Sequence, residues 1–188
     1  MIEEGEDIKR INEEIAARFG RIEAGITAAE TVVSLLETLI GGIEKEFDVP
    51  FVWLTLTDHE KAAKVVAAAQ SSNILKNRLS IVSREVLAKL LQDGMKPILA
   101  NSDLQPFYRL MPPARKYFAR SVAIVPLALD GEIIGTWNNG DAVPERYLPD
   151  MDSTLLQALA GKISAKLTRL AASKSDASDT PEPGGLHG

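Results

Sequence analysis

The sequence predicts one domain of the α/β (α+β) class, preceded by a long N-terminal helix. Large apolar residues recur every three or four positions over residues 8–47, and an amphipathic helical pattern ends the folded part. Between them lie two β-rich runs joined across Asp130-Gly131. The 188 residues suffice for one core with an extension, so we expect a helical segment 1–46, a domain 47–172 and a disordered, Ser-, Asp-, Pro- and Gly-rich tail 173–188.

The N-terminal pattern predicts a single helix of about forty residues, on the order of 60 Å long. Its apolar residues keep a heptad register from Phe19 onward, which is typical of a coiled coil. A helix of this length extends past a small domain, so we expect a homodimer, with the helices parallel or antiparallel. The expected interface consists of Phe19, Ile22, Ile26, Ala29, Val33 and Leu36. The alternative is an amphipathic helix that packs on its own domain.

The next part of the chain alternates between extended and helical patterns. Residues 51–56 are rich in residues that suit a strand, and Thr57 or Asp58 can cap a helix that runs to about Ala69. Residues 71–96 are mixed, with an extended stretch at 74–82 and a short helix at 84–92 capped by Ser83. A strand at 97–100 and a proline-containing loop with at most one helical turn at 101–116 follow.

The clearest element is a hairpin formed by residues 121–129 and 132–138. Its turn, Asp130-Gly131, suits the positive φ angles of a tight hairpin connection. A turn-rich stretch leads to the last helix, which Asp150 or Asp152 can cap.

Composition excludes several classes of function. The chain has no cysteine, which excludes disulfides, thiol nucleophiles and thiolate metal sites. Its net charge of -5 argues against nucleic-acid or anionic-membrane partners. The acidic N-terminus differs from a secretory signal, and no apolar run reaches membrane-spanning length, so we expect a cytoplasmic protein.

Residues 121–137, with Pro126 in the first strand and Gly135 in the second, resemble the late strands of GAF domains. Residues 147–160 are similar to the closing helix of that superfamily, and the whole is most similar to a bacterial branch of unknown function. The resemblance implies an antiparallel sheet with helices on one face and a ligand cavity on the other. It also implies a sensory or regulatory domain that binds a small molecule or a protein partner. The cyclic-nucleotide signature of the superfamily is not visible, and the lack of cysteine excludes covalent bilin attachment.

The residues do not predict an enzyme, a metal site or a cofactor. His59 is one of two histidines, and Asp58-His59-Glu60 is interpreted as a helix start whose acidic residues complement the helix dipole. No serine nucleophile elbow occurs in the sequence.

Aromatic and basic residues gather in the segment that borders the cavity in GAF domains. Guanidinium groups bind carboxylate or phosphate, and aromatic rings stack on planar ligands. Alternation places Trp137 and Asn138 on opposite faces of the hairpin, so one of them faces the cavity. The candidate ligand-binding residues are Phe107, Tyr108, Arg109, Arg115, Tyr117, Arg120, Trp137 and Asn138. The alternatives are a solvated loop whose aromatic residues cover the core, and a structural adaptor without a ligand.

Overall fold

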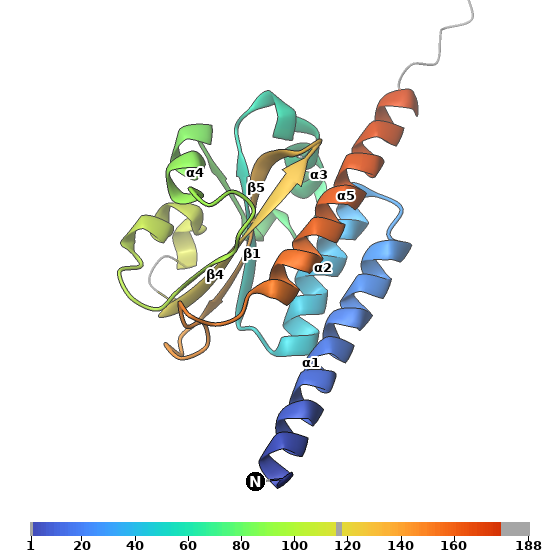
Figure 1. The fold of residues 1–188 in the computed structure, drawn as a ribbon. Helices are drawn as coiled ribbons and strands as arrows, with labels where there is room; N and C mark the ends of the chain where they lie inside the picture. Colours follow the sequence, from blue (N-terminus) through green and yellow to red (C-terminus); the bar gives the residue numbers. More distant parts are fainter. Residues whose placement is uncertain (1, 116–117, 178–188) are drawn as a thin grey trace, which may run out of the picture.

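The computed structural model describes residues 2–115 and 118–177, and Figure 1 shows a sheet with helices on both sides. The helices are α1 (Ile2–Ala28), α2 (Val32–Phe47), α3 (Ala63–Ser71), α4 (Arg84–Leu90) and α5 (Thr154–Ala177). The strands are β1 (Phe51–Thr57), β2 (Leu79–Val82), β3 (Ile98–Ala100), β4 (Ser121–Leu129) and β5 (Glu132–Asp141). Short 3₁₀ helices are η1 (Glu60–Ala62), η2 (Lys76–Arg78), η3 (Gln105–Leu110) and η4 (Pro113–Arg115).

The sheet of the described residues has five strands in the order β2-β1-β5-β4-β3. The pairs β1–β5, β5–β4 and β4–β3 are antiparallel, which confirms the α+β class with a mostly antiparallel sheet. The pair β1–β2 is parallel, contrary to the antiparallel expectation. A parallel pair requires a crossover connection, and residues 58–78 supply it. Through η1, α3 and η2 they return the chain to the end of the sheet at which β1 begins, so that β2 can run in the same direction as β1.

The β4–β5 hairpin forms where the sequence predicts it. Asp130 and Gly131 have φ angles of 50° and 78°, so both turn residues adopt the predicted positive φ. The register shifts between Leu127 and Ala128, because β5 carries one extra residue at Ile134. This bulge ends the strict alternation of side chains along β5.

The predicted uninterrupted helix over residues 8–47 is wrong, because the chain turns back between α1 and α2. The Thr31 side chain accepts a hydrogen bond from the Ser34 backbone N–H at 3.0 Å, and the Ser34 hydroxyl accepts one from the Thr31 N–H at 3.1 Å. This capping box starts α2. The two helices then lie antiparallel, with Arg21 bonded to Glu46 at 2.8 Å, a contact that holds the pKa of Glu46 below its usual range.

The residues of the predicted dimer interface pack against other residues of the same chain. Its side chains lie in the core between α1, α2 and α5, and only Val33 among them is half-buried. An antiparallel pair of helices within one chain produces the same three-and-four spacing as an intermolecular coiled coil, so the pattern does not distinguish them. The residues buried in this way are Phe19, Ile22, Ile26, Ala29 and Leu36.

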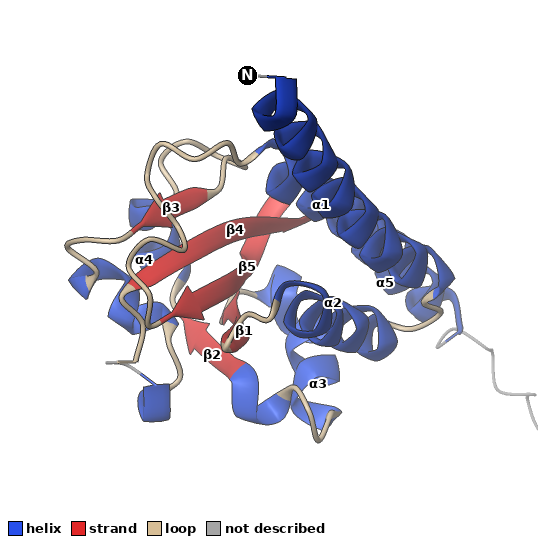
Figure 2. Cartoon of the chain, turned by 90° about the horizontal axis from the view of Figure 1, so that it is seen from below, coloured by secondary structure: helices blue, strands red, loops and turns tan. Residues whose placement is uncertain are grey.

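The two faces of the sheet carry separate cores. We call the face covered by α2 and α5 the inner face, and the face covered by α4 and η3 the outer face; Figure 2 shows α4 and the α1-α2-α5 group on opposite sides. Along β1, Val52, Leu54 and Leu56 point to the inner face. Phe51 and Trp53 point to the outer face, as strand alternation requires.

The remaining elements agree with the sequence only in part. α4 begins after Ser83, whose hydroxyl accepts from the Val86 N–H, as predicted, but only Leu79–Val82 of the stretch 74–82 that was expected to be extended is a strand. The segment at 101–116, predicted as a loop with at most one helical turn, holds both η3 and η4. The Asp152 carboxylate caps α5 by accepting from the Thr154 N–H at 2.9 Å. α5 continues to Ala177, past the predicted start of the tail at 173, and residues 178–188 lie outside the described part. None of the described helices is long and apolar enough to span a membrane.

Candidate functional site

A row of polar side chains lies in the middle of the outer face. Alternation along β1 turns Thr55 and Thr57 to this face beside Trp53, and β5 turns Thr136 and Asn138 to it. In the sheet register Trp53 is opposite Asn138 and Thr55 is opposite Thr136, so the side chains are direct neighbours across the two strands. These four side chains are fully buried, and Thr57 is 2% exposed. We call Trp53, Thr55, Thr136 and Asn138 the polar row.

The backbone of η3 closes over the polar row. The Leu110 carbonyl oxygen accepts hydrogen bonds from Trp53 Nε1 and from Thr55 Oγ1, both at 2.7 Å. Asn138 Nδ2 donates to Thr55 Oγ1 at 3.0 Å and to the Trp53 carbonyl at 3.4 Å. Because both acceptors face Nδ2, the orientation of the Asn138 amide is fixed, and neither acceptor pairs with its Oδ1 atom.

Two oxygen atoms of the polar row have no hydrogen-bond partner among the described residues. They are Thr136 Oγ1 and Asn138 Oδ1, and both are buried. A buried polar atom left unpaired costs about 1–3 kcal/mol, and native proteins contain few of them. Two such atoms on one face of the sheet are therefore an unusual feature of the described part of the chain.

A hollow of about 370 Å³ opens onto the same face. Thr57, the next outward residue of β1 after Thr55, lies in its wall, so the hollow begins about 7 Å along the strand from the polar row. Leu87, Leu91 and Ile133 provide apolar walls, and Arg84 and Glu132 provide charged ones. The hollow can accept a small molecule with both an apolar and a polar side.

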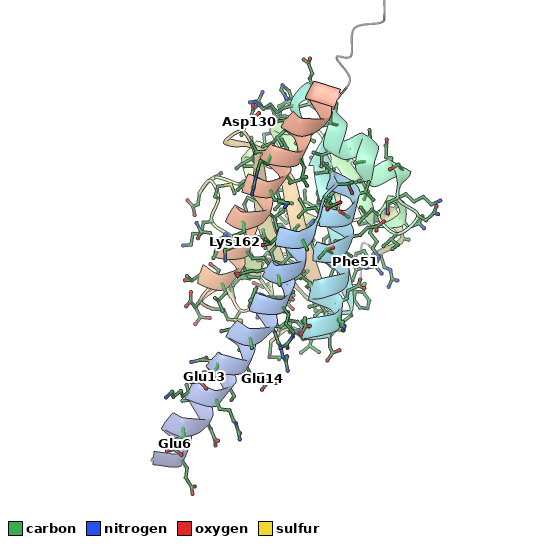
Figure 3. The ribbon with its side chains drawn as sticks, turned by 90° about the vertical axis from the view of Figure 1, so that its right-hand side faces the viewer. Glu6, Glu13, Glu14, Phe51, Asp130 and Lys162 are labelled. Carbon is green, nitrogen blue, oxygen red and sulfur yellow. The ribbon has the colours of Figure 1, made fainter. Side chains whose placement is uncertain are left out.

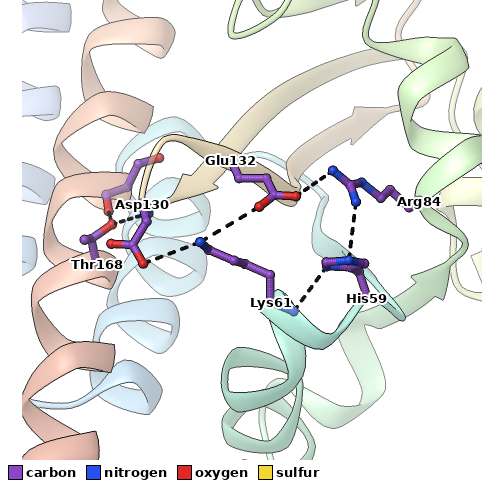
Figure 4. A network of polar contacts seen from close by, with 7 residues as sticks. His59, Lys61, Arg84, Asp130, Glu132 and Thr168 are labelled. Atoms are coloured by element: carbon purple, nitrogen blue, oxygen red, sulfur yellow. Dashed lines mark hydrogen bonds and ion pairs between the residues drawn. The ribbon is translucent and has the colours of Figure 1, made fainter.

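Arg84 and Glu132, which line the hollow, belong to a network of polar and charged side chains drawn in Figure 4. Arg84 Nη2 bonds Glu132 Oε1 at 2.6 Å, and Lys61 Nζ lies 3.9 Å from Glu132 and 3.7 Å from Asp130. His59 Nδ1 accepts from the Lys61 N–H at 3.2 Å, and its Nε2 atom lies 3.3 Å from Arg84 Nη1. The network thus joins α4, η1 and the β4–β5 turn.

The β4–β5 turn also contacts α5. The Asp130 N–H donates to Thr168 Oγ1 at 3.0 Å, and the Ala128 N–H donates to Ser164 Oγ at 2.9 Å. One turn therefore touches both the rim of the outer-face hollow and a helix of the inner face (Figure 4).

A second hollow, of about 240 Å³, lies on the inner face between α1, α2 and the start of α5. It is mainly apolar, with Asn139, Arg146 and Tyr147 among its lining residues. Burial raises the pKa of the Tyr147 hydroxyl, although the positive charge of Arg146 opposes that shift. Arg146 already bonds Asp141 and the Phe47 carbonyl, so its guanidinium is committed to the fold.

Of the predicted site residues, Asn138 lies in the polar row. Trp137 points to the inner face, where its Nε1 donates to Asn139 Oδ1 at 2.7 Å, so the two neighbours occupy opposite faces as alternation predicts. Trp137 is therefore excluded from the outer-face site.

The basic and aromatic residues of the predicted site are scattered. Tyr108 and Arg120 line one hollow, and Arg109 lines another beside Glu85 and Lys89. The Arg115 guanidinium lies over the rings of Phe51 and Phe118, at 5.1 and 5.8 Å from their centroids. Phe107 packs half-buried against the outer core, which agrees with the alternative of aromatic residues that cover the core. Tyr117 lies outside the described residues.

Sequence reasoning missed Trp53, Thr55 and Thr136. Threonines at alternate positions of strands that are otherwise buried were the available signal, because a buried hydroxyl on one face needs a partner.

Comparison with known proteins identifies the fold. No family model matches the chain, and no curated protein matches it. Among solved structures, the GAF domain of a phosphoenolpyruvate-protein phosphotransferase from Coxiella burnetii matches with a TM-score of 0.59 at 14% identity, covering 87% of this chain and 98% of that one.

Two further solved structures are similar. Free methionine-R-sulfoxide reductase from Neisseria meningitidis, in complex with its substrate, has a TM-score of 0.53 at 18% identity and covers 84% of this chain and 89% of that one. Residues 122 to 287 of a methyl-accepting chemotaxis protein have a TM-score of 0.55 at 18% identity, covering 82% and 99%. Together with the sheet order and the helices on its inner face, these matches show that the chain has the fold of a GAF domain.

Proposed function

We propose that the protein is a non-enzymatic regulatory domain that binds a small molecule on the outer face of its sheet. The observation that carries the proposal is the pair of buried oxygens, Thr136 Oγ1 and Asn138 Oδ1, that lack a hydrogen-bond partner in the described part of the chain. A ligand that pairs with them removes a cost that the free protein bears, and the adjacent hollow gives it a way in.

The fold supports binding at this face. One structural neighbour is a complex with its substrate, and others come from a phosphotransferase and a chemotaxis protein. GAF domains, which this chain resembles, place their ligand cavity on the side of the sheet opposite the packed helices. The polar row occupies that side here.

Binding rather than catalysis is proposed because the polar row offers an indole, two hydroxyls and an amide, none of which titrates near neutral pH. Regulation requires that a change at the ligand site reaches a surface to which a partner binds. The turn that contacts α4 through Glu132 also contacts α5 through Thr168, and α5 contacts α1 through Lys162 and Glu23 at 2.7 Å. This chain of contacts supports transmission from the outer face to the helices.

We further propose that the domain acts as a cytoplasmic homodimer held by α1. The first turns of α1 extend beyond the rest of the domain, as Figure 3 shows beside Glu6 and Glu13. Ile8 and Ile11 on these turns are 60% and 51% exposed. Pairing with α1 of a second copy would cover them, and would move the interface from the predicted residues 19–36 to the exposed N-terminal turns of α1.

A structural adaptor without a ligand is the second candidate. The outer face is already well filled, since Leu87, Leu110 and Met111 are buried over it. The same face therefore supports a protein in which only the helices and the surface act.

Native mass spectrometry separates these candidates. The purified protein is analysed as isolated, and again after incubation with nucleobases, amino acids and organic acids. Under the first proposal it retains or acquires one small molecule per chain, and Asn138→Leu abolishes this. Asn73→Leu, the same change at an exposed residue of the turn between α3 and η2, serves as the matched control and leaves binding unchanged. The absence of any bound molecule in both experiments would favour the adaptor.

A further inference from the structure

The peptide group between Leu110 and Met111 pairs with only some of the hydrogen-bonding groups of the polar row. Its carbonyl oxygen satisfies two donors, Trp53 Nε1 and Thr55 Oγ1. Its N–H, on Met111, donates instead to the Tyr108 carbonyl at 3.2 Å within η3. Because a trans peptide points its C=O and N–H in opposite directions, this group presents only an acceptor to the row. Asn138 Oδ1, which needs a donor, finds none among residues 2–115 and 118–177.

The unmet requirements of the row define the complementary molecule. A ligand in place of the Leu110 carbonyl needs an acceptor for Trp53 and Thr55, and a donor for Asn138 Oδ1, which belongs to the amide whose Nδ2 bonds Thr55. The Thr136 hydroxyl can pair with either kind of group. A single group that offers a C=O and an N–H side by side is a cis amide, which open-chain secondary amides avoid and rings enforce.

The side chains of the row are uncharged, so a charged group placed against them would be buried without a counter-ion. The complementary molecule is therefore neutral where it meets the sheet. Its remaining part can extend toward Thr57 into the hollow walled by Leu87 and Leu91.

We propose, on the basis of the proposed function, that the outer-face ligand is a neutral cyclic amide, a lactam or imide ring, and that η3 is an internal competitor for its site. The ring displaces the Leu110 carbonyl, takes over the hydrogen bonds of Trp53 and Thr55, and donates its N–H to Asn138 Oδ1. In the free protein the backbone of η3 closes the site. The apparent affinity of the protein for the ring is therefore lower than the intrinsic affinity, because only molecules in which η3 is open can bind it.

Tryptophan indole signals in a ¹H–¹⁵N NMR spectrum test the displacement directly. The chain has two tryptophans, on opposite faces of the sheet. Uracil, the probe, should shift the Trp53 indole signal and leave that of Trp137 in place, because Trp137 Nε1 keeps its bond to Asn139 on the inner face. Trp53→Phe assigns the signals, and Thr55→Val, which should move only the Trp53 signal, assigns them independently if that variant does not fold.

A matched probe tests the role of the ring N–H. 1,3-Dimethyluracil keeps both carbonyls but has no N–H, so it should bind about tenfold more weakly than uracil. In Asn138→Leu the two probes should bind alike, because the acceptor for the N–H is gone. A preference for uracil that persists in Asn138→Leu would assign the difference to the bulk of the methyl groups and overturn the hydrogen-bond assignment.

Two further results would overturn the proposal. Uracil binding that leaves the Trp53 signal in place would show that η3 is not displaced. The second result combines two observations: uracil does not bind at millimolar concentration, and mass spectrometry finds another molecule that wild type retains and Asn138→Leu loses. In that case the ligand is not a cyclic amide, but the proposed function stands. If no molecule is retained or acquired at all, both fail.

Discussion

Gly135 lies against the backbone of Thr55, so close that a Cβ atom on Gly135 would stand 2.1 Å from the Thr55 carbonyl oxygen. The obstacle is main chain in the centre of the sheet, which has little freedom to move. A glycine at this position therefore permits the close approach of the two backbones.

Gly135→Ala should therefore destabilise the fold by about 3 kcal/mol, since the added methyl group forces the strands apart. Urea unfolding followed by circular dichroism measures the loss. Gly161→Ala is the matched control, because Gly161 lies in α5 and a Cβ atom added to it would meet nothing within 4 Å. That change should stabilise by about 0.5–1 kcal/mol, and equal effects of the two changes would contradict the steric argument.

Thr136 and Thr55 are cross-strand neighbours that should respond to valine in opposite directions. Thr136→Val removes a buried hydroxyl that has no partner, so the free protein should gain about 1 kcal/mol of stability. Thr55→Val removes the donor to the Leu110 carbonyl and the acceptor of Asn138 Nδ2, and should cost about 1–3 kcal/mol. Chemical unfolding of both variants decides the matter, and a destabilised Thr136→Val would mean that its hydroxyl is paired.

The N-cap of α5 should make stability depend on acidity. The hydrogen bonds from Thr154 hold the pKa of Asp152 below its usual range. A carboxylate with a lowered folded-state pKa contributes stability that is present above its unfolded pKa and is lost as the pH falls through the folded one. Asp152→Asn keeps an acceptor for the cap but does not titrate. The difference in melting temperature between wild type and Asp152→Asn should be constant near neutral pH and shift against the wild type in acid.

The exposed N-terminal turns of α1 should control assembly. Ile8→Glu with Ile11→Glu should convert the proposed dimer to a monomer at micromolar concentration without loss of fold, because both side chains are largely exposed within one chain. Light scattering measures the mass, and Asn12→Glu on the same turns is the control for added charge. A wild-type protein that is already monomeric would end the dimer proposal. Removal of residues 1–28 is a poorer test, since it also removes buried Ile22 and Ile26.

Local chemistry made part of the fold predictable. The Asp130-Gly131 turn, the strand-forming run of β1 and the Asp152 cap each depend on a few neighbouring residues, and each is found where it was expected. The turn between α1 and α2 was not predicted, because its main signal, Thr31 with Ser34, is weak beside a heptad pattern that continues through it.

The candidate site was only partly predictable for a different reason. Alternation predicted that Asn138 and Trp137 lie on opposite faces of the sheet, and Asn138 is the one on the outer face. The group that completes the site is the carbonyl oxygen of Leu110, which meets Trp53 from 57 positions away. Every residue carries a carbonyl, so sequence gives no sign of which one will fill a buried position.

The helices α1 and α5 run in the same direction, since Glu23 meets Lys162 and the Thr27 carbonyl meets Lys166. α1 remains packed against the core through Phe19, whose ring centroid lies 4.8 Å from that of Phe47, and through Ile15. Ile8 lies about 10 Å from Ile15 at 1.5 Å per residue, so a tilt of roughly 5° about Ile15 would displace Ile8 by about 1 Å. A tilt of α1 that follows a movement of α5 would thus be passed on to its exposed N-terminal turns.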